Sequence, residues 1–200
     1  MKYIIQLIIL ILVLLQSACS GFVTQTESRE VGKFIALEVS GLAEVIITQA
    51  NEQKLLIKVS NMPLTDVVTY IENETLIITT KGFHRKESVQ VFVHYNQLNS
   101  ISTSGSAELT ATNTLNTQQM LITTNGAGDI KNLAIKADKL IVSINGSGNA
   151  NLDVEVENIA MEMNDAGDLS IQGIAKQQRI VSNGSRGTLS NANLVYSKLM

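Results

Sequence analysis

The chain of 200 residues has one cysteine, one proline, no tryptophan and only 4% aromatic residues. A single cysteine excludes an intramolecular disulfide and a zinc site built from several thiolates. So few aromatic side chains argue against a surface that stacks bases or sugar rings. The formal net charge is −3, so there is no excess of positive charge to attract nucleic acid or anionic lipid. We therefore expect no nucleic-acid partner.

The residues that are plentiful suit strands and turns. Threonine, serine, asparagine, isoleucine and valine are abundant, and they favour β-strands and polar turns over helices. Beyond residue 33, short alternating runs are separated by glycine, asparagine and serine, without a sustained helical period. The sequence therefore predicts an all-β protein.

Residues 1–18 have the pattern of a leader. They read MKYIIQLIILILVLLQSA, with one cation at Lys2 and an apolar run from Ile4 to Leu15. This run is shorter than the roughly 20 apolar residues that a membrane-spanning helix needs. Its length and flanks are typical of a secretory signal peptide. We expect residues 1–18 to be a lipoprotein-type signal peptide outside the fold.

The single cysteine, Cys19, directly follows this leader. The junction LLQSACSG resembles a bacterial lipobox, although Gln16 stands where an apolar residue is usual. From this resemblance we expect a lipid such as palmitate on Cys19. Two or more acyl chains would hold the protein stably at a membrane. In some bacteria an aspartate after the lipidated cysteine is associated with retention in the inner membrane. Here Ser20 follows Cys19, so the resemblance points to the outer membrane. Two alternatives stay open: ordinary cleavage after Ser20, which gives a soluble secreted or periplasmic protein, and an uncleaved membrane anchor.

The rest of the chain divides into two parts. Residues 19–33 are polar and without periodicity, so we expect a tether there. Residues 34–200 are expected to form one folded domain.

This domain contains an internal repeat. Five similar segments are STSGSAEL at 102–109, TTNGAGDI at 123–130, SINGSGNA at 143–150, EMNDAGDL at 162–169 and VSNGSRGTL at 181–189. The aligned residues, which are 21, 20, 19 and 19 positions apart, are Ser104, Asn125, Asn145, Asn164 and Asn183. A near-constant step of about 20 residues is typical of a solenoid in which each step is one coil.

The strand before each turn supports the same alignment. The position three residues before the aligned one is always aliphatic or methionine: Ile101, Ile122, Val142, Met161 and Ile180. Because apolar and polar residues alternate, coils in register place these side chains in one inward column. Three short strands per coil, stacked at roughly 4.8 Å, would give a parallel β-helix about 30–40 Å long. A sandwich needs no such repeat, and a propeller blade is about twice as long.

The N-terminal part of the domain is less regular. The segment 36–47 aligns with 100–111, which places Leu37 in the inward column at an offset of 64 residues, about three coils. Longer loops around Pro63 and at 81–87 break the period. We expect an irregular β region or cap there.

The glycine-rich turns are interpreted as corners of coils. Asparagine and glycine tolerate the left-handed backbone that a sharp corner requires, and stacked asparagine side chains can hydrogen-bond along a column. Calcium-binding repeats of similar composition recur about every nine residues, and Asn149 and Gly187 replace the acids Asp129 and Asp168 in the alignment. A phosphate-binding loop would be followed by a helix, whereas the residues after the turn, DIKNLAIKA at 129–137, alternate and predict a strand. We expect no metal and no cofactor.

These features together resemble the auto-transporter adhesin head GIN domain family of bacterial envelope proteins. The resemblance rests on REVGKFIALEVSG at 29–41, on the spaced turns and on the lipoprotein-like leader, and it covers residues 29–190. It implies a right-handed parallel β-helix at the cell envelope and brings no catalytic residues. Family members generally continue with another turn and strand, whereas this chain ends soon after Gly187. Either a last coil is lost or the C-terminal edge stays open.

We expect a non-enzymatic, lipid-anchored envelope protein that binds a glycan or another envelope protein. Coils of this length leave no long loops to build a catalytic cleft, and neither His84 nor His94 has a partner that the sequence indicates. One alternative is a small polysaccharide-acting enzyme, which a cluster of acids with a lysine or arginine in one groove would favour. Another is a structural spacer that assembles through its C-terminal edge. The oligomeric state is left open.

Overall fold

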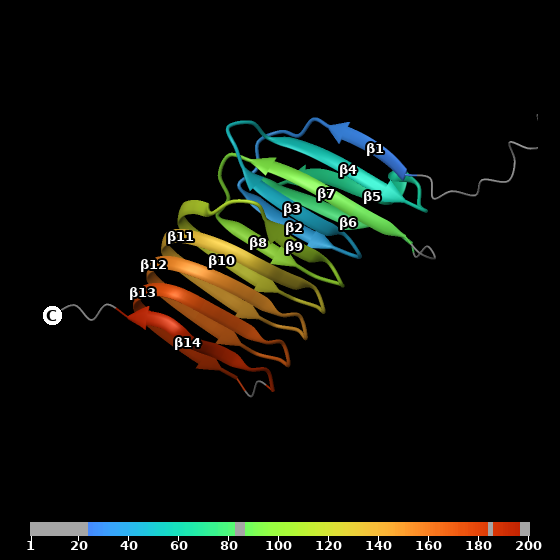
Figure 1. Cartoon of the computed structure of the whole chain (residues 1–200). Coiled ribbons are helices and arrows are strands. Elements are labelled where there is room, and N and C mark those ends of the chain that lie inside the picture. The colour runs from blue at the N-terminus through green and yellow to red at the C-terminus, as the bar shows by residue number, and fades with distance from the viewer. Residues whose placement is uncertain (1–23, 83–86, 184–185, 197–200) are drawn as a thin grey trace, which may run out of the picture.

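A computed structural model describes residues 24–82, 87–183 and 186–196. These residues form a column of stacked β-coils closed at its N-terminal end by a cap (Figure 1). Cys19 and the leader lie outside the described residues, as does His84. No helix in the described ranges is long and apolar enough to cross a membrane.

Parallel strands build the column. They are β8 (Ser100–Thr103), β9 (Glu108–Ala111), β10 (Leu115–Thr124), β11 (Asp129–Ile144), β12 (Ala150–Met163), β13 (Leu169–Ser182) and β14 (Leu189–Tyr196). The long strands β11 to β13 bend around the coil, so each one pairs with its neighbours along three successive sides. This arrangement is a β-solenoid of about five turns with about 20 residues per turn, and it confirms the predicted fold.

The predicted inward column is present in the stated register. Ile122 pairs with Ile101 on one side and with Val142 on the other, and Val142 pairs with Met161, which pairs with Ile180. The first four side chains are buried, whereas Ile180 is 43% exposed on the outermost described coils.

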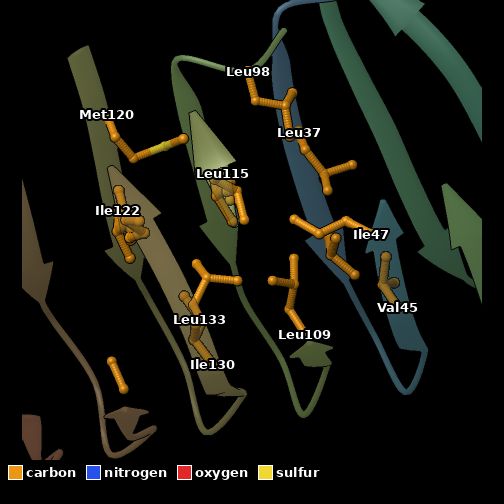
Figure 2. Close-up of a cluster of buried hydrophobic side chains, with 14 of the residues drawn as sticks. Leu37, Val45, Ile47, Leu98, Leu109, Leu115, Met120, Ile122, Ile130 and Leu133 are labelled. Atoms are coloured by element: carbon orange, nitrogen blue, oxygen red, sulfur yellow. The ribbon is translucent and has the colours of Figure 1, made fainter. Parts of the chain in front are cut away.

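Alternation of buried and exposed residues along each strand fills the column with aliphatic side chains. Figure 2 shows Leu37, Leu109, Ile122 and Leu133, which come from neighbouring coils, within one common interior. A single coil is too thin to bury its inward face alone, so stacking supplies the hydrophobic stabilisation.

The first coil of the column is β2 (Ala36–Ser40) followed by β3 (Glu44–Gln49). Leu37 pairs directly with Ile101, so the predicted alignment of Leu37 is correct. The offset of 64 residues is one step of the stack, however, and the expectation of about three coils is wrong. The intervening chain leaves the solenoid and forms the cap instead.

The cap comprises β4 (Lys54–Ser60), β5 (Val67–Glu72), β6 (Thr75–Thr80) and β7 (Ser88–Tyr95), with a short 3-10 helix at Leu64–Asp66. Strands β6 and β7 stack in parallel on β2 and β3, whereas β4 and β5 pair antiparallel with β7 and β6. The hairpin between β5 and β6 turns at Asn73 and Glu74, both of which have positive φ. Antiparallel hairpins reverse the chain and so end the coil repeat.

One more strand belongs to the cap. Strand β1 (Thr24–Arg29) pairs antiparallel with β4 along its whole length. The expected tether at 19–33 is therefore wrong for residues 24–29. Their polar sequence hid the strand because the outward side chains of an edge strand are solvated and only its backbone joins the sheet.

The side chain of Arg29 connects β1 to the 3-10 helix and to β5 by hydrogen bonds. Its Nη1 donates hydrogen bonds to the carbonyl of Val67 at 2.8 Å and to Oγ1 of Thr69 at 2.9 Å. Its Nη2 donates to Glu27 Oε2 at 2.9 Å and to the carbonyl of Leu64 at 3.2 Å. The hydrogen bond from Arg29 holds the pKa of Glu27 below its ordinary value. One side chain thus joins β1, the 3-10 helix and β5.

Candidate functional site

The repeated turns form one corner of the column, and glycine is required there by close backbone approach. A Cβ on Gly146 would lie 2.2 Å from the carbonyl oxygen of Gly126, and a Cβ on Gly148 would lie 2.1 Å from that of Gly128. Atoms cannot approach so closely, so any side chain at these positions would push the coils apart.

The physical reason differs from the one expected. A left-handed backbone is found only at Gly41 and Gly105 among the stacked corner glycines that the structure describes. In the regular coils each glycine makes room for the backbone of the coil before it. The interpretation of TTNGAGDI as a corner is correct. Glycine is needed there because the coils stack closely, not because the backbone has a positive φ.

The aligned asparagines at this corner form a hydrogen-bonded ladder, as predicted. The side-chain amide of Asn145 donates to Oδ1 of Asn125 at 3.1 Å, and Asn164 donates to Asn145 at 2.7 Å. Asn183 continues the ladder onto Asn164 at 2.7 Å. Each inner member of this ladder therefore both donates and accepts.

A second polar ladder runs on the other side of the turn. Asp129 Oδ1 accepts the backbone N–H of Asn149 at 2.9 Å and its side-chain amide at 3.1 Å. Asn149 Oδ1 accepts the backbone N–H of Asp168 at 3.0 Å, and Asp168 Oδ1 accepts that of Thr188 at 2.6 Å. The member on the last coil is Thr188 rather than Gly187, because an extra residue in NGSRGT shifts the register.

Beside this second ladder lies a groove of about 450 Å³ on the outer face of β11 to β14, which we call the corner groove. Its outward-facing residues, one pair from each of four coils, are Asp129, Lys131, Asn149, Asn151, Asp168, Ser170, Thr188 and Ser190. Side chains shorten from Lys131 to Asn151 and then to the serines, so the groove opens toward the C-terminal coils.

The groove offers hydrogen-bonding groups in register. Asn151, Ser170 and Ser190 are exposed, and their side chains have no hydrogen-bond partner within the described ranges. Lys131 donates to Glu108 on the coil before it at 2.6 Å, and this bond raises the pKa of Lys131. The groove can therefore present donors and acceptors at the roughly 4.8 Å spacing of the coils.

The groove also brings together two acids and a base. Asp129 and Asp168 lie two coils apart, roughly 10 Å at the spacing of neighbouring strands. One oxygen of each already accepts a backbone N–H. In the described ranges, no three acidic, histidine or cysteine side chains are grouped as metal ligands would be.

His94 does not join this groove. It is exposed on the outer face of β7, where its neighbours in register are Thr48 and Lys54. The groove is not evident from the turn residues or the inward column, because Asn151, Ser170 and Ser190 are outward-facing and lie two positions beyond the second ladder. The signal available was a column of short polar residues at the repeat spacing.

Solved structures share this fold. A Parabacteroides distasonis protein described as a putative lipid binding protein matches with a TM-score of 0.74 at 18% identity, over 86% of this chain and 74% of that chain. A putative adhesin from Bacteroides fragilis matches with a TM-score of 0.53 at 15% identity, over 84% of this chain and 97% of that one. One from Parabacteroides merdae matches with a TM-score of 0.51 at 16% identity, over 84% and 96%.

These identities show a shared fold alone. No curated protein matches the chain. A family model does match it, over residues 33–199, and this range includes every strand from β2 to β14. The chain therefore belongs to the family described as "Putative auto-transporter adhesin, head GIN domain".

Proposed function

We propose that this protein is a non-enzymatic, lipid-anchored protein of the bacterial outer membrane whose solenoid binds a glycan or another envelope protein. The observation that carries the binding role is the corner groove, with its unpartnered polar side chains Asn151, Ser170 and Ser190 on three successive coils. The adhesin-like description of the family supports an envelope location. The lipobox-like junction before Cys19 supports the anchor.

Anchoring is tested by incorporation of labelled palmitate in cells. The wild-type chain and a Ser20→Ala control should both take up label, because both keep the acceptor thiol. Cys19→Ser should take up none. Label that persists in Cys19→Ser, or that is absent from the wild type, refutes the anchor.

Binding is tested with the purified protein on an array of bacterial envelope glycans and peptidoglycan fragments. A bulky residue in the groove, Ser170→Trp, should abolish any binding that the wild type shows. The matched control is Asn158→Trp, an exposed position on β12 outside the groove, which should bind as the wild type does. Equal binding by both variants would place the ligand elsewhere.

A polysaccharide-acting enzyme is the second candidate, because the groove does combine Asp129, Asp168 and Lys131. The roughly 10 Å between the positions of the two aspartates exceeds the 5–5.5 Å between the carboxyl groups of retaining glycosidases and also the 6.5–9.5 Å of inverting ones. Lys131 is engaged by Glu108, and each acid by a backbone N–H. We expect no release of reducing sugar from the same glycans. Release that is abolished by Asp168→Asn would favour the enzyme.

A self-assembling spacer is favoured by a different observation. Ile174 and Val195, which pair with each other on the two outermost described strands, are 51% and 63% exposed. Self-assembly would give a mass that rises with concentration in light scattering, and a constant monomer mass would exclude this role.

A further inference from the structure

The distance between the proposed lipid and the fold is short. Strand β1 begins at Thr24, only five residues after Cys19. A fully extended chain spans at most about 3.6 Å per residue, so the two Cα atoms are at most about 18 Å apart. A tether that continued to residue 33 would have allowed about 50 Å.

Strand β1 is also the far end of the column from the corner groove (Figure 1). Along the sheet, β1 is followed by β4, β7, β3, β9 and β11, where the groove begins, and β12, β13 and β14 then stack in turn on β11. At roughly 4.8 Å per strand, the groove extends from about 24 to about 38 Å beyond β1.

The outer face of the three strands nearest the anchor carries no carboxylate. Register places these residues on that face: Thr24, Thr26, Ser28, Lys54, Leu56, Lys58, Ser60, Ser88, Gln90, Phe92 and His94. Lys58 lies over the Phe92 ring at 4.8 Å from its centroid. The acid of β1, Glu27, is on the opposite face and pairs with Arg29. Two lysines suit an anionic headgroup surface, which would repel the acids of the groove.

We propose that the cap end, formed by β1, β4 and β7, lies against the bilayer that holds the lipid, and that the corner groove is held away from it on the distal coils. This inference rests on the proposed lipid on Cys19. The orientation of the column relative to the bilayer would then be fixed, with the groove facing away from the membrane. The connection from Cys19 to β1 is too short to let the domain move far from the bilayer to reach a partner.

The test uses the full lipidated chain in vesicles of phosphatidylethanolamine and anionic phosphatidylglycerol that contain a nitroxide-labelled lipid. Acylation blocks the only native thiol, so single cysteines can carry a fluorophore. Ser88→Cys marks the cap, and Gln177→Cys on β13 marks the distal coils; both positions are exposed. Five strand spacings, roughly 24 Å, separate β7 from β13.

Quenching should be several-fold stronger at position 88 than at position 177. A flexible linker of 20 glycine and serine residues inserted after Gly21 should reduce the quenching at 88. Equal quenching at both positions, or stronger quenching at 177, overturns the proposal, and unchanged quenching with the linker shows that the short connection does not position the cap. Failure of the anchor itself is distinguishable, because such a protein would not sediment with the vesicles.

Discussion

At the scale of single residues, the fold depends on positions where a coil touches the next one. Gly146 shows this most clearly, because its missing side chain leaves room for the backbone of the coil before it. Asparagines and threonines at the same corner then decide how the polar groups of stacked coils are satisfied.

Gly146→Ala should lower the free energy of unfolding by about 3 kcal/mol, since the new Cβ would lie 2.2 Å from the Gly126 carbonyl oxygen and overpack the corner. The matched control is Gly32→Ala, whose Cβ would meet only Ile71 Cδ1 at an ordinary 3.5 Å. Denaturant unfolding measures both. A similar effect of the two substitutions would contradict the stacking argument.

Asn145→Leu removes both hydrogen bonds that this residue makes to Asn125 and Asn164. We expect a loss of about 1–2 kcal/mol, because each such bond contributes about 0.5–1.5 kcal/mol. The control is Asn158→Leu, at an exposed position on β12, which should change the free energy of unfolding by less than about 0.5 kcal/mol. Unchanged thermal unfolding of Asn145→Leu would rule out a stabilising ladder.

Thr124 is fully buried, and its hydroxyl makes no hydrogen bond within the described residues. It lies between Thr103 and Ile144 in the stack. Thr124→Val keeps the shape and removes the unsatisfied group, so it should raise stability by about 1 kcal/mol. Thr123→Val, which points outward on the same strand, should be nearly neutral. Destabilisation by Thr124→Val, read from the denaturant midpoint, would show that the hydroxyl has a partner.

At the scale of elements, the coil strands are predictable and the cap strands are not. The inward column from Leu37 to Met161 follows from alternation and repeat length, because parallel coils keep one register. Pairing in the cap depends on hairpins and on which strand adds to an edge, and neither is periodic. Strand β1 is the clearest case, since six polar residues join the sheet through their backbone.

Arg29→Ala should release β1 from the cap, because it removes hydrogen bonds to three carbonyl or hydroxyl groups. We expect a loss of about 2–3 kcal/mol and faster hydrogen exchange of the β1 amides. The exposed Lys33→Ala is the control. Unchanged exchange in Arg29→Ala would mean that backbone pairing with β4 suffices.

The ion pair of Arg29 with Glu27 adds a pH dependence to the same element. Because the folded pKa of Glu27 is lowered, its contribution is present above the ordinary carboxyl pKa and is lost as pH falls through the lowered value. The Glu27 side chain is 41% exposed, so water screens the pair and this contribution is small.

At the scale of the whole molecule, the sequence predicts the family, the solenoid and the corner turns, but not the groove. The groove arises from outward positions that carry no apolar signal, and it exists only once four coils are stacked. The short distance from Cys19 to the fold is likewise not predictable from the sequence, because it follows only once residues 24–29 are seen to form a strand.

The central claim is that the lipid on Cys19 fixes this column to the envelope. Mass spectrometry of the N-terminal peptide of the mature protein, purified from membranes, tests it most directly. We predict a peptide that begins at Cys19 and carries acyl chains. A peptide that begins at Gly21, after ordinary cleavage, or at Met1, with the leader retained, would contradict it.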